Sequence, residues 1–102
     1  MLFFSKVSPQ VHVTPQNQTV PEGYTANLTC KAKGIPKPTT VWNFSTGELP
    51  SEAVVNYSDE GSFLQLPSTT IAMGGQYKCT ATNTANTTSA TAILRVLGVH
   101  VK

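Results

Sequence analysis

The segment GQYKCTAT, residues 75–82, decides the fold, because apolar and polar residues alternate along it. Tyr77, Cys79 and Ala81 take every second position, as expected of a β-strand with one buried face. The same alternation runs through Leu28, Cys30 and Ala32, through Leu64 and Leu66, and through Ala90, Ala92, Leu94 and Val96. The sequence therefore predicts a sandwich of short strands whose inner faces carry these side chains.

The prolines leave little room for helices, because they are spread along the chain from Pro9 to Pro67. Clusters of Gly, Pro, Asn and Asp fall between the alternating segments, where strands need turns. A chain of 102 residues holds one small domain. We expect this domain over residues 9–97, with residues 1–8 and 98–102 as flanking or linker segments.

The charge and hydropathy of the chain exclude two classes of function. Seven Lys and Arg against five Asp and Glu give a net charge of +2, which is too small for a nucleic-acid-binding surface. No segment approaches the roughly 20 apolar residues of a membrane helix, so we expect no direct membrane insertion by this segment. The apolar start, residues 1–4, is too short for a signal peptide, and we expect any signal or anchor in a longer parent chain.

The cysteine pair provides the main chemical constraint. Cys30 and Cys79 each occupy an inward position of an alternating strand, so both sulfurs are expected in one core, from opposite sheets. A disulfide across the sandwich is the natural result. The alternative is a pair of buried free thiols, as in a cytosolic protein.

Several motifs together resemble the immunoglobulin superfamily. Trp42 follows Cys30 in the next predicted strand, and Tyr77-Lys78-Cys79 is similar to the Tyr-x-Cys of the sixth strand of that family. Within the family, the I-set is indicated by GIPKP at residues 34–38, by Leu64-x-Leu66 and by Ala81-Thr82-Asn83.

The resemblance implies an all-β fold, an immunoglobulin-like Greek-key β-sandwich of the I-set, with two antiparallel sheets joined by one disulfide. It also implies a core signature of Trp42, Leu64 and Tyr77. Trp42 is expected to pack on the disulfide. The Tyr77 hydroxyl is expected to bond to the backbone of the turn before its strand.

Two positions depart from the family pattern. The residues before Tyr77 lack the Asp that usually caps this turn, so we expect Tyr77 and the packing of Met73 to hold it. Thr40 takes a usually aliphatic inward place in the strand of Trp42, with Val41 outward. This leaves either a small core deficit or a shifted register.

Glycosylation sequons are frequent. Every Asn except Asn83 begins an Asn-x-Ser/Thr motif, and the sequons start at Asn17, Asn27, Asn43, Asn56 and Asn86. This excess predicts passage through the secretory pathway, although a Thr-rich strand composition can also create sequons by accident. Asn27 and Asn43 are expected to face solvent on different sheets, which would leave the loops and an edge strand for contacts.

Catalytic and metal-binding groups are not suggested by the sequence. His12 and His100 lie near opposite ends, outside any zinc-binding spacing. No nucleophile-and-base grouping is evident, and Asp59-Glu60 is expected in a solvated turn. We therefore expect no enzyme activity, no metal and no cofactor.

The loop before Trp42 offers candidate contact residues. Lys33 and Lys37, with Lys31, form a small basic group, and Ile35 lies at the loop tip. The alternative for Ile35 is a half-buried position in the packing of the loop. Heparan sulfate is a less favoured partner for this group than protein, because three lysines are few.

These observations predict an extracellular module that mediates protein–protein recognition or cell adhesion within a receptor or adhesion-molecule ectodomain. Its expected place is the cell surface or the secreted space. Its expected partners are proteins or neighbouring immunoglobulin domains, with homophilic association left open. The alternatives are an intracellular structural domain of the muscle type and a secreted matrix or ligand-binding protein.

Overall fold

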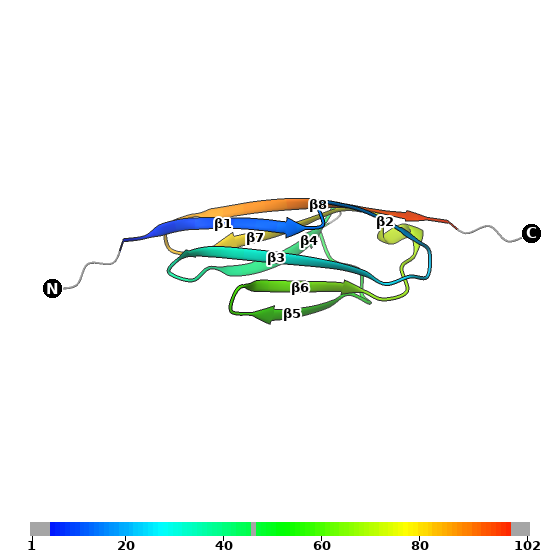
Figure 1. The fold of residues 1–102 in the computed structure, drawn as a ribbon, viewed down its shortest axis with the longest axis horizontal. Helices are drawn as coiled ribbons and strands as arrows, with labels where there is room; N and C mark the ends of the chain where they lie inside the picture. Colours follow the sequence, from blue (N-terminus) through cyan, green and yellow to red (C-terminus); the bar gives the residue numbers. More distant parts are fainter. Residues whose placement is uncertain (1–4, 46, 99–102) are drawn as a thin grey trace, which may run out of the picture.

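The structure, a computed structural model, describes residues 5–45 and 47–98 and shows two packed β-sheets (Figure 1). One sheet has the strand order β1-β3-β6-β5 and the other has β2-β8-β7-β4. The elements are β1 (Val7–Thr14), β2 (Asn17–Pro21), β3 (Ala26–Ile35), β4 (Thr39–Phe44), β5 (Val54–Ser58), β6 (Gly61–Leu66), η1 (Ile71–Met73), β7 (Gly75–Thr82) and β8 (Thr87–Leu97). The all-β immunoglobulin-like sandwich expected from the sequence is confirmed.

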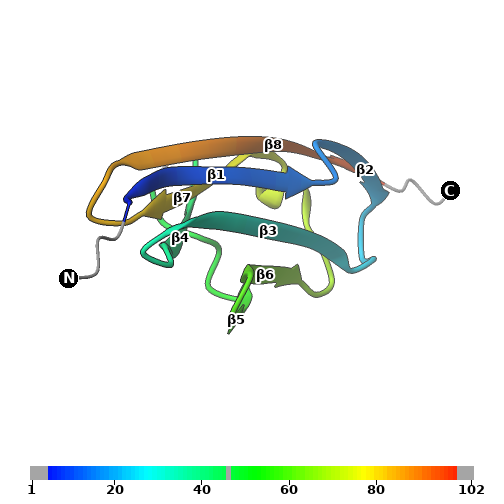
Figure 2. The same ribbon diagram turned by 60° about the vertical axis from the view of Figure 1, so that its left-hand side comes forward.

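The first two strands, β1 and β2, belong to different sheets, so the chain crosses from one sheet to the other between them. Together they close one side of the sandwich. β1 pairs antiparallel with β3, whereas β2 pairs parallel with β8, and the other strand pairs are antiparallel. β1 also packs against β8, and the two strands run side by side in both views (Figure 2). At the opposite side, β5 and β4 are the edge strands of their sheets. We call this opposite side, formed by β4, β5 and the space between them, the open side.

In the structure β1 begins at Val7, which pairs with Ile35, and β8 ends at Leu97. The expected domain bounds, residues 9–97, stay a prediction. The rest of the expected flanks, residues 1–4 and 99–102, lies outside the described residues, and so does His100.

The disulfide joins the two sheets at the centre of the core. Cys30 on β3 and Cys79 on β7 are bonded, and their side chains are buried. Trp42 pairs in register with Cys79 across β4 and β7, and it belongs to the same buried cluster. Leu64, from β6, packs in this cluster too. The pairing that the inward positions predict is confirmed.

A hydrogen-bonded link between the sheets lies next to the disulfide. The indole Nε1 of Trp42 donates to the hydroxyl of Ser62 at 2.8 Å, and Ser62 pairs in register with Cys30. The hydroxyl of Thr40 also donates to Ser62 at 3.1 Å. Thr40 is therefore inward in the usual register, while Val41 is 55% exposed. A polar group in the core is tolerated because its hydrogen bonds are satisfied.

The turn before β7 is held without an acidic cap. The Tyr77 hydroxyl donates to the carbonyl oxygen of Met73 at 2.6 Å, and both side chains are buried. The short helix η1 has Thr70 at its N-cap, without a side-chain hydrogen bond. Burial raises the pKa of Tyr77 to about 12, because the phenolate would lose its hydration.

The raised pKa of Tyr77 predicts a loss of stability in alkali. The unfolded chain releases this proton near pH 10, so the contribution is complete below about pH 10 and is lost as the pH rises through about 12. Between about pH 9 and about pH 11 the expected loss in unfolding free energy is about 1.4 kcal/mol. Urea unfolding at the two pH values measures it.

Tyr77→Phe is the matched variant for this effect. It is expected to lower stability at neutral pH by about 1 kcal/mol, because the Met73 carbonyl loses its donor. Between the two alkaline pH values, it is expected to lose about 1.4 kcal/mol less than the parent chain. Equal losses in both proteins would contradict the assignment.

Candidate binding surfaces

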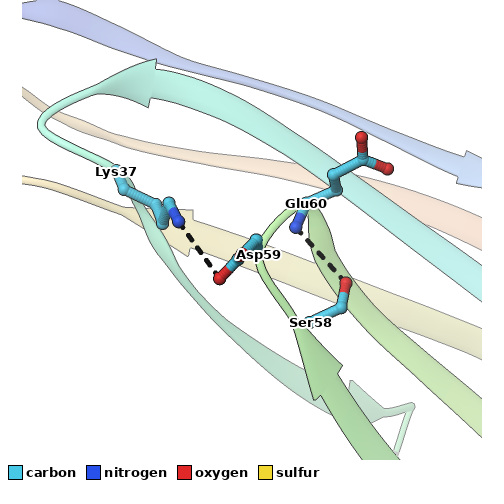
Figure 3. Close-up of polar contacts among 4 residues, drawn as sticks. All are labelled: Lys37, Ser58, Asp59 and Glu60. Atoms are coloured by element: carbon cyan, nitrogen blue, oxygen red, sulfur yellow. Dashed lines mark hydrogen bonds and ion pairs between the residues drawn. The ribbon is translucent and has the colours of Figure 1, made fainter.

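The residues expected to contact a partner lie at the end of β3 and in the loop after it. Ile35 is the last residue of β3 and is 50% exposed. Lys31 and Lys33 lie on the outer face of their sheet, in register with His12 and Gln10 of β1. Figure 3 shows Lys37 beside the turn between β5 and β6.

A shallow groove of about 320 Å³ brings these lysines together with two acids. Lys37 Nζ lies 3.3 Å from Asp59 Oδ1, and both side chains are well exposed, so the pair adds little stability. The Glu60 amide donates to the Ser58 hydroxyl at 3.3 Å and helps to shape the turn. The groove is lined by Lys31, Ala32, Lys33, Gly34, Lys37, Pro38, Asp59 and Glu60.

Asp59 and Glu60 lie in an exposed turn, as the sequence suggested, but their proximity to the lysines was not foreseen. The structure places that turn against the basic group, because β6 pairs with β3 and its first residue, Gly61, lies beside Lys31. Knowledge of the pairing between β3 and β6 would have predicted that the acids lie beside the lysines. The mixed charge weakens the positive potential on which a sulfated polysaccharide would depend.

The sequons lie on both broad faces and at one loop. Asn17, Asn27, Asn56 and Asn86 are exposed, whereas Asn43 is half-buried and its Nδ2 donates to the Gly47 carbonyl at 3.1 Å. Asn27 and Asn43 belong to different sheets, as expected. Occupancy of all these sites stays a prediction.

Asn83 joins three segments at one end of the sandwich. Its Nδ2 donates to the carbonyls of Val7 and Pro36 at 2.8 and 2.9 Å. Its Oδ1 accepts from the amides of Ala85 and Asn86 at 2.8 and 3.1 Å. The start of β1, the loop after β3 and the loop after β7 are thus held by one side chain, which shapes the surface around Ile35.

Asn83→Ala is expected to lower the unfolding free energy by about 2 kcal/mol, because several backbone groups lose a partner at once. The neighbouring exposed change Thr84→Ala is the control, with an expected effect within about 0.5 kcal/mol. Denaturant unfolding measures both. Similar small losses in the two variants would show that the Asn83 bonds contribute little.

Within residues 5–45 and 47–98, no three His, Cys, Asp or Glu side chains gather in a metal-binding arrangement. No helix in the described part of the chain is long and apolar enough to cross a membrane. His12 is exposed on β1.

The two sheets, the parallel β2–β8 pair and the buried disulfide beside Trp42 define an immunoglobulin-like sandwich of the I-set. The chain belongs to the immunoglobulin domain family, whose model, described as "Immunoglobulin domain", matches residues 8–83.

Several large curated proteins contain a similar segment. The mouse basement membrane-specific heparan sulfate proteoglycan core protein is 39% identical over 89 residues, covering 87% of this chain and 2% of that protein. The mouse peroxidasin homolog is 34% identical over 93 residues, covering 88% of this chain and 6% of that protein. Zebrafish contactin-5 is 33% identical over 75 residues, covering 74% of this chain and 7% of that protein. The chain thus spans a small fraction of each relative.

Solved titin structures share the fold. A chimeric titin carrying an exogenous peptide from decorin has a TM-score of 0.82 at 27% identity, covering 94% of this chain and 100% of that one. A complex of titin with an obscurin-like immunoglobulin domain has a TM-score of 0.82 at 26% identity, covering 93% of this chain and 99% of that one.

Proposed function

We propose that this chain is an extracellular recognition module of a large matrix or adhesion protein, and that it binds proteins without catalysing a reaction. The observation that carries this proposal is the disulfide between Cys30 and Cys79, which are 1% and 0% exposed. A cytosolic domain would keep these thiols reduced, whereas secreted domains form and retain such bonds.

The relatives support a matrix protein better than a receptor. A basement-membrane proteoglycan core protein, hemicentin-2 and contactin-5 all contain a segment similar to this chain. We therefore favour a domain within a long multidomain chain, with neighbouring domains and protein partners around it. The intracellular muscle-type alternative draws on the titin structures, but the likeness to them concerns the fold.

Binding without catalysis fits the use of the buried polar groups. The hydroxyls of Thr40, Ser62 and Tyr77 all take part in bonds that hold the core together. The peroxidasin homolog shares only 6% of its length with this chain, so any activity of that protein is not carried over. Rigid sandwiches commonly present loops and edges to partners.

Secretion from a eukaryotic host tests the proposal. We expect protein without titratable thiols and with added carbohydrate mass at one or more sequons. Thiol titration under denaturing conditions and intact mass before and after enzymatic deglycosylation measure both. Stoichiometric free thiols in the native secreted protein would contradict an extracellular role.

A further inference from the structure

The open side of the sandwich carries two strand edges, β4 and β5, of which β5 is the outermost strand of its sheet in both views (Figures 1 and 2). In the described part of the chain β5 pairs only with β6. The unpaired edge of such a strand presents backbone donors and acceptors to another chain. We propose that the open side binds a basic, extended segment of a partner protein, which adds as a strand along β5.

A groove beside β5 gives the added strand a place for side chains. It has a volume of about 370 Å³ and is lined by Pro38, Thr39, Thr40, Tyr57, Ser58 and Gly61. Tyr57 is 68% exposed, although it lies opposite the buried Ser62 on the inner side of β5. An exposed tyrosine over a groove is typical of residues that dominate binding energy, because it buries a large area with little loss of side-chain freedom.

The charge distribution selects a basic partner. Residues 48–60 contain Glu48, Glu52, Asp59 and Glu60, which are all but one of the five acids, and none of the seven Lys and Arg. Glu48 and Glu52 lie toward Met73, in a shallow surface hollow, whereas Asp59 and Glu60 follow β5 at its other end. Acids thus lie near both ends of the edge, but Lys31, Lys33 and Lys37 line the same groove as Asp59 and Glu60, so the unbalanced negative charge lies at the Glu48 and Glu52 end. Lysine or arginine side chains of an added strand would meet complementary charge at that end.

The same charges disfavour a second copy of this chain as the occupant. If two β5 strands paired antiparallel, the residues before one strand would lie beside the residues after the other. Glu52 of each copy would then approach Asp59 and Glu60 of its neighbour, and like charges across a strand pair are destabilising. The edge therefore fits a partner of opposite charge.

A sugar on Asn56 would leave the groove accessible. Asn56 lies opposite Phe63, which is exposed on the outer face of the sheet, whereas the adjacent Tyr57 points to the groove side. Successive side chains of a strand point to opposite faces, so carbohydrate and partner would occupy different sides of β5.

A peptide-display selection tests this inference on the secreted, oxidised domain, with a library of random dodecapeptides as the probe. Peptides are enriched on the parent domain alone. The enriched peptides are mapped by amide chemical shifts, and their affinities are measured by fluorescence anisotropy. We expect peptides rich in Lys and Arg, with shift changes confined to β4, β5 and the turn around Asp59.

Matched variants separate the open side from general surface effects. Tyr57→Ala is expected to lower the affinity for these peptides by at least about tenfold. Neutralising Glu48, Glu52 and Glu60 together to Gln is expected to weaken binding and to reduce its salt dependence. Tyr24→Ala, at a tyrosine that is 64% exposed elsewhere, and Glu22→Gln should leave affinity unchanged.

The inference is overturned by the absence of any enriched peptide, by enrichment of acidic or uncharged peptides, or by shifts that map to another surface. The inference would also be overturned if sedimentation velocity showed a dimer of the parent domain and a monomer of the Tyr57→Ala variant. A second copy would then occupy the edge. The inference depends on the proposed function in one respect, namely that the domain recognises proteins. Free thiols in the secreted domain would count against the extracellular role and leave the peptide result standing.

Discussion

Loss of the bond between Cys30 and Cys79 is expected to lower the free energy of unfolding by about 4 kcal/mol. The bond closes a loop with a sequence separation of 49 residues, and the chain-entropy estimate for such a loop is about this size. A small domain has a total stability of roughly 5–15 kcal/mol, so the reduced protein should be close to the limit of folding at physiological temperature. Urea unfolding of oxidised and reduced wild type measures the difference.

Reduced wild type and the double variant Cys30→Ala/Cys79→Ala form a useful pair. Reduction removes the cross-link and keeps both sulfur atoms in the core, whereas the variant also removes buried volume. We expect the variant to be the less stable of the two, because the core around Trp42 loses contacts. A reduced domain as stable as the oxidised one would show that the fold does not depend on the bond.

Gly61→Ala is expected to lower the unfolding free energy by at least about 3 kcal/mol. Gly61 begins β6 with φ of 149°, in a region that favours glycine. A Cβ atom at this position would overlap the carbonyl oxygen of Cys30, so the backbone of β3 or β6 would have to move. The movement would disturb the strand pairing that supports both the disulfide and Ser62.

Gly23→Ala is the matched control for this substitution. Gly23 also has a positive φ, 92°, but a Cβ atom there meets nothing within 4 Å. Its expected loss is about 1 kcal/mol, from backbone strain alone. Thermal or denaturant unfolding of the two variants separates strain from steric overlap. Equal losses at both positions would show that the contact with Cys30 relaxes at little cost.

The strands and the disulfide between the sheets could be predicted from the sequence because both depend on the two-residue alternation of buried and exposed side chains. Burial on every second residue places Leu28, Cys30, Tyr77, Cys79 and Leu94 in a single interior, and they are all buried in the structure. The pairing of the cysteines follows from those inward positions. The bond from Tyr77 to the backbone before its strand could be inferred from the resemblance to a known family.

Contacts that depend on register between distant strands could not be predicted. Thr40 suggested a deficit in the core, since nothing local shows that Ser62 would lie within hydrogen-bonding distance. Asp59 lies in the solvated turn that the sequence suggested, but its ion pair with Lys37 could not be predicted, for the same reason. In both cases the partners are far apart in the chain and meet only when β6 pairs with β3 and the sheets stack.

The side-chain amide of Asn83 constrains which substitutions the loop after β7 can accept during evolution. Asn83 is the one asparagine outside a sequon, and both hydrogens of its Nδ2 are already donated, to Val7 and Pro36. Ala85 is exposed, yet Ala85→Thr would complete the acceptor motif at Asn83, and an attached sugar would replace one of those hydrogens. In a secreted chain, Ser and Thr are therefore disfavoured at position 85, although the folded domain has space for their side chains.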